Sequence, residues 1–459
     1  MALSNLNLRT GLESRGTIAV LAHSAGITDG AERSHVEMVH ELIDLGYQVH
    51  TLAADTEDKG MGEAIRAEGG TLRVIPGISR WWRRQGDPAL QTPFPYSPPS
   101  ILLEELVAIN PDLLITQTIT IPQGALAARM LGIPHVWYLR EFGDLDHGFV
   151  MPLPAKQLGE LVRTLSTEVV TNSAAVRDHF FGKSIENVTV LHPTPKLKTS
   201  AIAKAGKKPW SLGVVARLES RGKRQFDALS AIAALRANGL DVPIQLFGYL
   251  DDSIADIWQG HAKNLGIEDL VTFAGVTTSR EDMFASFDAI AVTSQNEAFG
   301  RIPFEATSAG VPVIYADAAG PSEYLTDGVT GLAYQPLDHF GLAAAIKKLH
   351  DDATLGRELV ARARQDLLSE ERALEYRQIL AEIVERTINA GPKPKLIAAF
   401  RDIYTLSGGR DFLVPDYIEP PEVQGLKKHV KSLQRQISDA NAEMTRQRRL
   451  LEKAGVNHL

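Results

Sequence analysis

The chain has 459 residues, which is enough for two or three domains of ordinary size. Hydrophobic residues make up 44% and charged residues 23%, which excludes a fibrous or a wholly disordered chain. The formal net charge of −8 does not favour nucleic acid as a partner. The chain has no cysteine, which excludes disulfides, zinc ribbons, iron–sulfur clusters and a thiol nucleophile.

The N-terminal residues 1–16 are polar and mixed in charge, without the apolar centre of a signal peptide. No apolar run approaches the roughly 20 residues that span a bilayer. We therefore expect a cytoplasmic protein, with peripheral contact at the inner face of the membrane as an additional interpretation.

Over residues 1–195, short apolar runs alternate with amphipathic segments such as Glu32–Leu45 and Gln123–Leu131. This alternation indicates βαβ units and a parallel sheet that is covered on both faces. The expected strands are Thr17–Ala22, Gln48–Ala53, Thr71–Ile75, Asp112–Thr116, His135–Leu139, Glu168–Thr171 and Val188–Leu191.

Residues 78–100 interrupt this pattern with five prolines, four aromatic residues and three arginines, and we predict no regular structure there. One interpretation is a long surface loop. The other is an acceptor- or membrane-contact loop, because Trp81 and Trp82 beside arginines suit an anionic interface.

The pattern restarts after a Lys- and Pro-rich linker at 196–210, and predicts a second α/β domain over 211–390. The expected strands are Ser211–Ala216, Ile244–Phe247, Val271–Phe273, Ala289–Thr293 and Val311–Tyr315. We expect two doubly wound, Rossmann-like domains that face each other across a cleft, with ligands at the carboxyl ends of the strands.

A proline-containing connector, 391–421, precedes a C-terminal segment, 422–459, in which apolar residues recur at heptad spacing. The seam over 426–454 predicts a coiled coil that forms a homo-oligomer or docks a partner. The alternative is a terminal helix that packs on its own domain.

The segment 294–337 carries the clearest chemical signal. Glu297 lies in the polar turn that follows the expected strand Ala289–Thr293, and Glu305 follows eight residues later, about one turn into a helix. The amides of Phe299, Gly300 and Arg301 would lie at the N-terminus of this helix, where free donors and the helix dipole attract phosphate. Because Gly300 has no side chain, a ligand could approach the backbone closely.

A second signal lies in the same domain. The strand that begins the domain runs into a loop with Arg217 at its start and Lys223 six residues later. Two fixed cations at the carboxyl end of a sheet could neutralise a diphosphate.

Together these residues resemble the retaining glycosyltransferases of family 4, which have the GT-B architecture. The family's two glutamates separated by seven residues match Glu297 and Glu305, and its diphosphate-binding pair matches Arg217 and Lys223. Its downstream pattern is matched at 309–314, 320–323 and 327–332, and its Gly-Gly-Ala-Glu-Arg turn resembles 29–33. The resemblance covers about residues 17–390 and is looser in the first domain.

The resemblance implies roles for these residues. Arg217, Lys223 and the amides near Phe299–Arg301 would hold the donor diphosphate, Glu305 would bind the ribose hydroxyls, and Glu297 would contact the donor sugar. Gly30 would let the first domain approach the diphosphate. The donor would be a nucleotide sugar used as substrate, with no cofactor and no metal required.

The first domain departs from the family pattern at two places. Arg140 stands where many members have a histidine, with Glu141 beside it, and Asp29 replaces the first glycine of the Gly-Gly pair. We expect Arg140, Glu141 and His23 on the acceptor side, although His23 also suits a structural role. Asp144, Asp146 and His147 resemble a metal-binding Asp-x-Asp, but we predict a loop that lines the cleft.

The implied function is transfer of a sugar, with retention, from a nucleotide-diphosphate sugar to a glycan or lipid-linked acceptor in cell-surface polysaccharide synthesis. The alternative is an inactive GT-B-like scaffold or regulatory partner that acts through the C-terminal helix. A GT-B-like phosphorylase or epimerase would share the phosphate site.

Overall fold

The computed structural model describes residues 14–84, 87, 98–183, 185, 187–199, 210–217, 221–248, 252–277 and 279–393. The connector beyond residue 393 and the coiled coil expected over 422–459 therefore lie outside the described residues. No helix in the described part is both long and apolar enough to cross a membrane.

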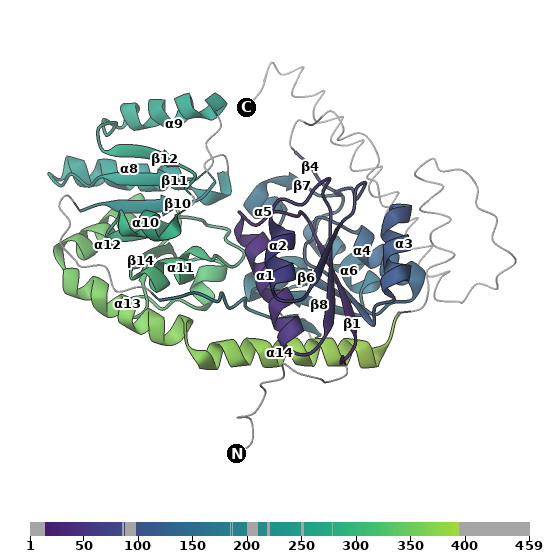
Figure 1. The fold of residues 1–459 in the computed structure, drawn as a ribbon. Coiled ribbons are helices and arrows are strands. Elements are labelled where there is room, and N and C mark those ends of the chain that lie inside the picture. The colour runs from purple at the N-terminus through teal and green to yellow at the C-terminus, as the bar shows by residue number, and fades with distance from the viewer. Residues whose placement is uncertain are drawn as a thin grey trace, which may run out of the picture.

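The first domain is built on a sheet of seven parallel strands in the order β3-β2-β1-β5-β6-β8-β9 (Figure 1). These strands are β1 (Thr17–Ala22), β2 (Gln48–Ala53), β3 (Thr71–Val74), β5 (Leu113–Thr116), β6 (His135–Leu139), β8 (Glu168–Thr171) and β9 (Val188–Val190). Its helices are α1 (Gly30–Asp44), α2 (Met61–Ala67), α3 (Ser100–Ile109), α4 (Gln123–Leu131), α5 (Asp144–His147), α6 (Ala155–Leu165) and α7 (Ala174–Phe180).

The second domain is built on six parallel strands in the order β12-β11-β10-β13-β14-β15. These strands are β10 (Leu212–Val215), β11 (Ile244–Phe247), β12 (Val271–Gly275), β13 (Ala289–Val292), β14 (Val313–Ala316) and β15 (Leu332–Tyr334). Its helices are η2 (Arg221–Lys223), α8 (Gln225–Ala237), α9 (Asp252–Asn264), α10 (Arg280–Ala285), α11 (Ile302–Ala309), η3 (Gly320–Glu323), α12 (His339–Asp351) and α13 (Ala353–Leu367). The expectation of two doubly wound α/β domains is confirmed.

Each sheet has apolar clusters on both of its faces, because successive residues of a strand face opposite sides of the sheet. In β1, Ile18 and Val20 pack with α1 and α2, while Ala19 and Leu21 pack with α3 and α4. In β13, alternate residues also enter different clusters. Burial on both faces explains why these strands read as continuous apolar runs.

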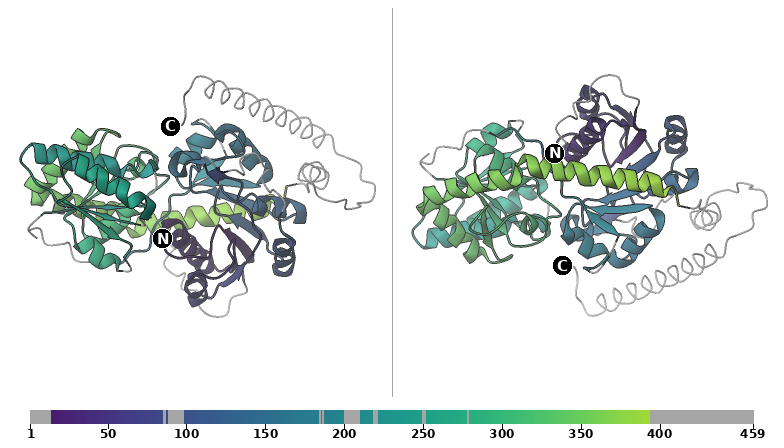
Figure 2. Two further views of the ribbon diagram at one scale, coloured as in Figure 1. Left: turned by 90° about the horizontal axis from the view of Figure 1, so that it is seen from above. Right: turned by 90° about the horizontal axis from the view of Figure 1, so that it is seen from below.

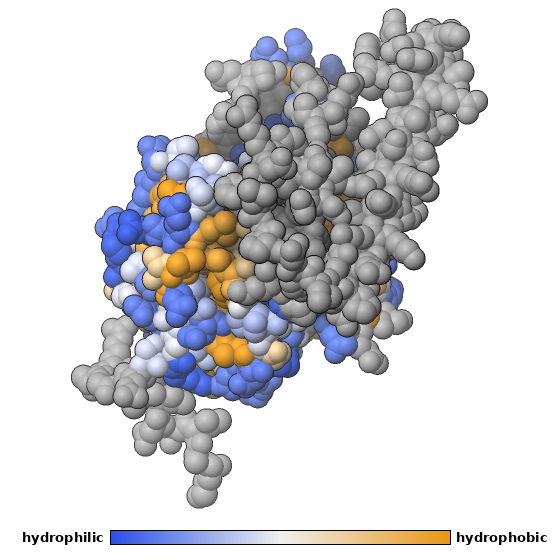
Figure 3. All heavy atoms as spheres, turned by 90° about the vertical axis from the view of Figure 1, so that its right-hand side faces the viewer, coloured by the Kyte–Doolittle hydropathy of each residue, from blue (hydrophilic) through white to orange (hydrophobic). Residues whose placement is uncertain are grey.

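Residues 78–100 contain regular structure, contrary to the expectation. Arg83–Arg84 form β4, which pairs antiparallel with β7 (Phe149–Val150), and α3 begins at Ser100. Trp81 is 1% exposed and stacks on Trp137, so Trp81 belongs to the core and is not available to a membrane surface. Figure 3 shows the face on which α3 lies, where apolar side chains gather among polar ones.

The last described helix, α14 (Glu370–Ala390), returns to the first domain, although the sequence places it within the second. Its residues Tyr376, Leu380 and Val384 are part of an apolar cluster of the first domain. Arg377 Nε bonds Glu41 Oε2 at 2.8 Å, which fixes α14 to α1. Figure 2 shows this helix running beneath both domains, so α14 connects them.

Candidate functional site at the domain interface

The strand order in the second domain reverses between β10 and β13, which are neighbours in the sheet. A loop after β10 leads in one direction and a loop after β13 in the other, and such a reversal opens a crevice at the carboxyl ends of the strands. Arg217 and Lys223 follow β10, and Glu297 follows β13. The topology therefore brings these three residues to the same edge of the sheet.

Lys223 and Glu297 form an ion pair across this crevice, with 2.7 Å between Nζ and Oε2. Thr293 Oγ1 donates to the Lys223 carbonyl at 2.6 Å, which ties the lysine loop to the end of β13. Burial disfavours the charge on both side chains. The attraction between them outweighs burial, so the pKa of Lys223 is raised and the pKa of Glu297 is lowered. Both groups are therefore charged at neutral pH.

Arg217 lies just after the carboxyl end of β10, with its side chain 55% exposed. Its Nη1 atom is 3.8 Å from Oδ2 of Asp29, which belongs to the first domain. Gln225 Nε2 donates to the Arg217 carbonyl at 2.8 Å and so holds the backbone at this point. Asp29, the departure from the family's glycine pair, thus faces a cation of the second domain.

The turn before α11 holds its amides in a defined direction. Gly300 has φ +87°, which side-chain-bearing residues rarely adopt, and a Cβ there would lie 3.0 Å from Glu297 Cγ. The Tyr324 hydroxyl donates to the carbonyls of Gly300, at 2.7 Å, and Phe299, at 3.0 Å. In a trans peptide the N–H points opposite to the C=O, so the N–H groups of Gly300 and Arg301 point away from Tyr324. Phe299 itself packs its ring against Phe304 and Tyr324.

Glu305 is 4% exposed and is surrounded by arginines. Arg33, from α1 of the first domain, approaches Glu305 Oε1 at 3.3 Å. Arg280, from α10, forms an ion pair with Glu305 Oε2. A buried carboxylate with this many cationic neighbours is held in place. Arg33 and Arg280 were missed by the sequence analysis, because only the fold brings them to Glu305.

Arg301 crosses to the first domain. Its guanidinium bonds both carboxylate oxygens of Glu37, at 2.6 and 2.9 Å, and Ser34 Oγ at 2.7 Å. A Cβ at Gly30 would lie 3.1 Å from Arg301 Cδ, so the bare Gly30 backbone leaves room for this side chain. The structure therefore brings two of the predicted site residues, Gly30 and Arg301, into contact.

The two domains also meet through Glu323 of η3, which the sequence analysis did not single out. Its carboxylate accepts hydrogen bonds from Ala174 N at 2.8 Å and Ala175 N at 2.7 Å, and His192 Nε2 lies 2.8 Å away. A carboxylate of the second domain thus occupies the N-terminus of α7 in the first.

The first-domain residues divide into two groups. His23 and Arg140 follow β1 and β6, and burial lowers the pKa of His23 to about 4, with the positive charges of Arg80 and Arg140 adding to the effect. Arg140 Nη1 donates to Gln117 Oε1 at 2.7 Å. Glu141 instead accepts from Ile119 N, at 2.8 Å, and from the Thr118 hydroxyl, so it holds a neighbouring loop.

Asp146 and its neighbours are engaged locally. Asp146 accepts from the amides of Phe142, at 3.0 Å, and Gly143, at 2.8 Å, while Asp144 lies 2.9 Å from His179 Nε2. Within the described ranges no group of three His, Asp or Glu residues is placed to hold a metal ion.

Residues 29–194 match the family described as glycosyl transferase 4-like domain, and residues 196–366 match glycosyl transferases group 1. Among solved structures, Anabaena Alr3699/HepE in complex with UDP-glucose superposes with a TM-score of 0.61 at 20% identity, covering 81% of this chain and 100% of that one. The chain has the GT-B glycosyltransferase fold. TarM also superposes on it, with a TM-score of 0.62 at 13% identity over 82% of this chain and 99% of that one.

Curated relatives of this GT-B chain match over shorter stretches. It is 38% identical over 97 residues to the lipopolysaccharide core biosynthesis glycosyltransferase LpsD of Rhizobium meliloti (strain 1021), which is 21% of this chain and 28% of the relative. It is 28% identical over 214 residues to glycogen synthase of Mycobacterium tuberculosis (strain ATCC 25618 / H37Rv), which is 45% of this chain and 50% of the relative. The chain thus spans half or less of the length of these relatives.

Proposed function

We propose that this GT-B chain transfers a sugar, with retention, from a nucleotide-diphosphate sugar to a glycan or lipid-linked acceptor in cell-surface polysaccharide synthesis. One observation carries the proposal. Arg217, the Lys223–Glu297 pair and the N-terminus of α11 converge where the strand order reverses between β10 and β13.

The chemistry of the reaction explains why these groups suit it. Breaking a glycosyl–phosphate bond builds negative charge on the departing diphosphate and positive charge on the anomeric carbon. Fixed cations and amides that face the diphosphate lower the barrier, because they are already oriented before charge develops. Arg217, Lys223 and the amides of Gly300 and Arg301 take this role.

The carboxylates have separate roles in the proposal. Glu305 accepts hydrogen bonds from the ribose hydroxyls, for which Arg33 must give way. Glu297 contacts the donor sugar once Lys223 turns to the diphosphate, and the leaving phosphate takes the acceptor's proton. In the proposal the chain's own cations neutralise the diphosphate, so chelation with EDTA leaves turnover unchanged.

The relatives support the donor and the pathway. Alr3699/HepE is described in complex with UDP-glucose, and LpsD with lipopolysaccharide core biosynthesis. Because the site places cations rather than a catalytic carboxylate pair around the leaving group, we favour transfer over hydrolysis.

The test is release of nucleoside diphosphate from a panel of nucleotide sugars, with the anomeric configuration of the product read by NMR. We expect one donor to be consumed and an α-linked donor to give an α-linked product. Arg217→Ala and Glu297→Gln should abolish release, while Arg236→Gln, on the far surface of the second domain, should not. Inversion of configuration would refute the retaining mechanism.

The scaffold alternative rests on residues 422–459, outside the described part. The same assay separates it from the enzyme. A scaffold would turn over no donor and would lose its role on removal of 422–459, whereas an enzyme would keep donor turnover after that removal.

A further inference from the structure

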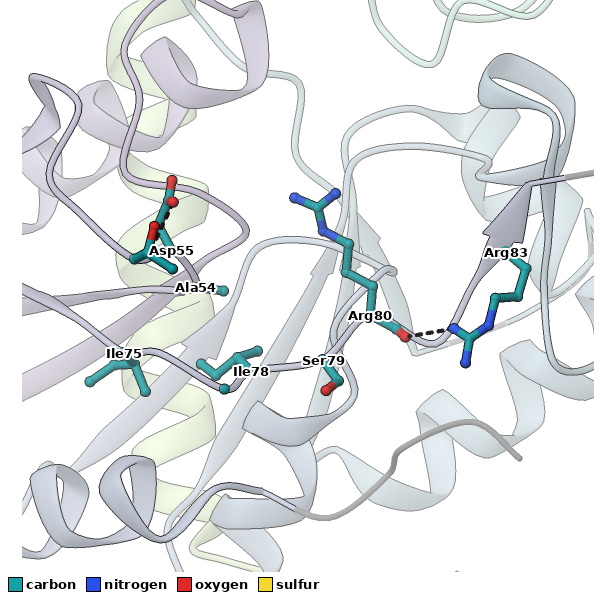
Figure 4. A pocket seen from close by; sticks show the side chains of 9 residues that line it. Ala54, Asp55, Ile75, Ile78, Ser79, Arg80 and Arg83 are labelled. Carbon is teal, nitrogen blue, oxygen red and sulfur yellow. Dashed lines mark hydrogen bonds between the residues drawn. The ribbon is translucent and has the colours of Figure 1, made fainter. Parts of the chain in front are cut away.

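A hollow of about 520 Å³ lies on the first domain, where the loop after β2 meets the segment that joins β3 to β4. Ligand sites commonly have volumes of about 300–1,000 Å³, so one or two sugar rings fit here. Its lining includes Ala54, Asp55, Ile78, Ser79, Arg80 and Arg83, which Figure 4 shows around the opening. No residue of the donor site described above lines it.

The hollow carries positive charge. Asp55 is neutralised from within the domain, because its carboxylate bonds Lys59 Nζ at 2.9 and 3.1 Å and the amides of Thr56 and Ala25. Arg80 is exposed, and among the described residues no carboxylate lies within 4 Å of its guanidinium. In Figure 4 the Arg80 guanidinium extends into the space between the Asp55 loop and β4.

The segment that bears these arginines is held by packing. Arg83 Nη1 donates to the Trp82 carbonyl at 3.0 Å, and the Trp82 ring stacks on Phe149 of β7 with 3.7 Å between centroids. Trp81, one residue earlier, is anchored in the core. The backbone that carries Arg80 is therefore fixed before any ligand binds, which reduces the entropy lost on binding.

One loop separates the hollow from the donor cations. The loop between β1 and α1 contacts one residue of the lining, because the Ala25 amide donates to Asp55 Oδ2 at 3.3 Å. The same loop reaches Arg217 of the second domain at Asp29. His23 begins this loop, and the positive charges of Arg80 and Arg140 both add to the lowering of its pKa by burial. A ligand in the hollow therefore lies on the first-domain side of the transfer site.

We infer that this hollow binds an anionic group of the acceptor, a phosphate or a carboxylate on a sugar, with Arg80 as its main contact. Arginine suits both groups, because its planar guanidinium offers paired donors that match two oxygens. The inference rests on the proposed function, since it names the class of acceptor for that reaction.

The test uses purified full-length protein saturated with whichever nucleoside diphosphate stabilises it, so that added anions do not occupy the donor site. Glucose 6-phosphate, glucuronic acid, glucose and inorganic phosphate are then titrated separately, and binding is measured by calorimetry. We expect glucose 6-phosphate or glucuronic acid to bind and glucose to bind at least tenfold more weakly. The stronger of the two probes distinguishes a phosphorylated from a uronic acceptor.

Variants at two neighbouring arginines decide whether Arg80 is responsible. Arg80→Gln should weaken binding of the anionic sugar about tenfold, the loss of one charge-assisted bond. Arg80→Lys keeps the positive charge and should therefore keep part of the affinity for the anionic sugar. Arg84→Gln, four residues along and not part of the lining, is the matched control and should bind as the wild type does. Circular dichroism verifies that each variant is folded.

Two results would overturn the inference while leaving the proposed function intact. In the first, nucleoside diphosphate binds but neither anionic sugar binds better than glucose. In the second, inorganic phosphate binds as tightly as glucose 6-phosphate, so that the sugar adds nothing and the hollow is a simple anion site. Absence of nucleoside diphosphate binding would instead contradict the proposed function.

Discussion

Arg301 of the second domain bonds both carboxylate oxygens of Glu37 on α1, at 2.6 and 2.9 Å, with its own side chain only 9% exposed. The residue before the donor-side helix α11 is thereby joined to the opening helix of the first domain. The pair fixes how the two halves of the cleft face each other.

Glu37→Gln should open the domains. Glu37→Gln leaves Arg301 with Glu305 at 3.5 Å as a remaining carboxylate partner, so we expect a loss of about 1–3 kcal/mol of stability. We expect a lower melting temperature and a larger radius of gyration in small-angle scattering. The control is Asp269→Asn, which breaks an exposed pair with Arg236 within one domain. It should change the melting temperature and the radius of gyration much less than Glu37→Gln does. Equal effects of the two variants would show that Arg301–Glu37 does not hold the domains.

Gly300→Ala should damage the site beyond its effect on stability. A Cβ at φ +87° is strained by roughly 1–2 kcal/mol, and here it also meets Glu297 Cγ at 3.0 Å. Gly239→Ala is a matched control, since Gly239 has φ +80° with nothing within 4 Å of a Cβ. We expect both variants to lose similar stability in urea unfolding. Only Gly300→Ala should weaken nucleoside diphosphate binding, and a similar loss in Gly239→Ala would contradict the assignment.

Lys223 and Glu297 should respond to substitution with opposite effects on diphosphate binding. Lys223→Gln removes a cation and should weaken binding by about 2 kcal/mol. Glu297→Gln frees Lys223 from its partner, so it should leave diphosphate affinity equal or tighter while sugar transfer falls. Titration calorimetry beside the transfer assay separates the two effects, with Lys347→Gln on α12 as the control.

The same pair predicts a flat pH profile for diphosphate binding. The pKa of Lys223 is raised and that of Glu297 is lowered, so both stay charged between about pH 6 and 9. Titration of Lys223 or Glu297 should therefore cause no change in the affinity for nucleoside diphosphate across this range. A steep change that Glu297→Gln abolishes would refute this account of the pair.

Two buried histidines should make the fold sensitive to acid. Burial lowers the pKa of His35 and of His135 from 6.5 to about 3. The unfolded chain takes up these protons below about pH 6.5 and the folded chain does not, so stability is complete above that pH and is lost on acidification. From pH 6.5 to 5 the two should cost roughly 3 kcal/mol together, and His23, whose pKa burial lowers to about 4, should add about half as much again.

Urea unfolding at pH 7 and pH 5 measures this loss. His135 bonds Thr116 Oγ1 at 2.9 Å and Ser166 Oγ at 3.1 Å, and glutamine can keep hydrogen bonds to hydroxyls without taking up a proton. His135→Gln should therefore flatten the pH dependence by about a third, because His23 and His35 still contribute, and His339→Gln, a partly exposed residue, should leave it unchanged. An unchanged slope in His135→Gln would contradict the prediction.

The strands could be predicted from the sequence because they are buried on both faces and so read as apolar runs. β1, β2, β6, β8 and β11 have the expected bounds, and the other expected strands differ by one or two residues at one or both ends. β15 was missed, since three residues, Leu332–Tyr334, give too short a pattern. The amphipathic pattern of α14 shows that one face is buried, but it does not show that the face covers the first domain.

The candidate site was predictable where local sequence determines it. Glu297, Gly300 and Arg301 lie within five residues, so their turn and helix start could be expected. The side-chain partners could not. Arg301 meets Glu37 and Glu305 meets Arg33 across more than 250 residues of sequence, and only the docking of the two domains brings them together.

The most direct test of the account is thermal stabilisation by nucleoside diphosphates without added metal. UDP, GDP, TDP and ADP are each added to the wild type and to Arg217→Ala. At about 100 times its dissociation constant, a ligand should stabilise the folded protein by roughly 2.7 kcal/mol. We expect one diphosphate to raise the melting temperature of the wild type, and Arg217→Ala to lose that shift. No shift with any diphosphate, or a shift that Arg217→Ala retains in full, would contradict the proposed donor site.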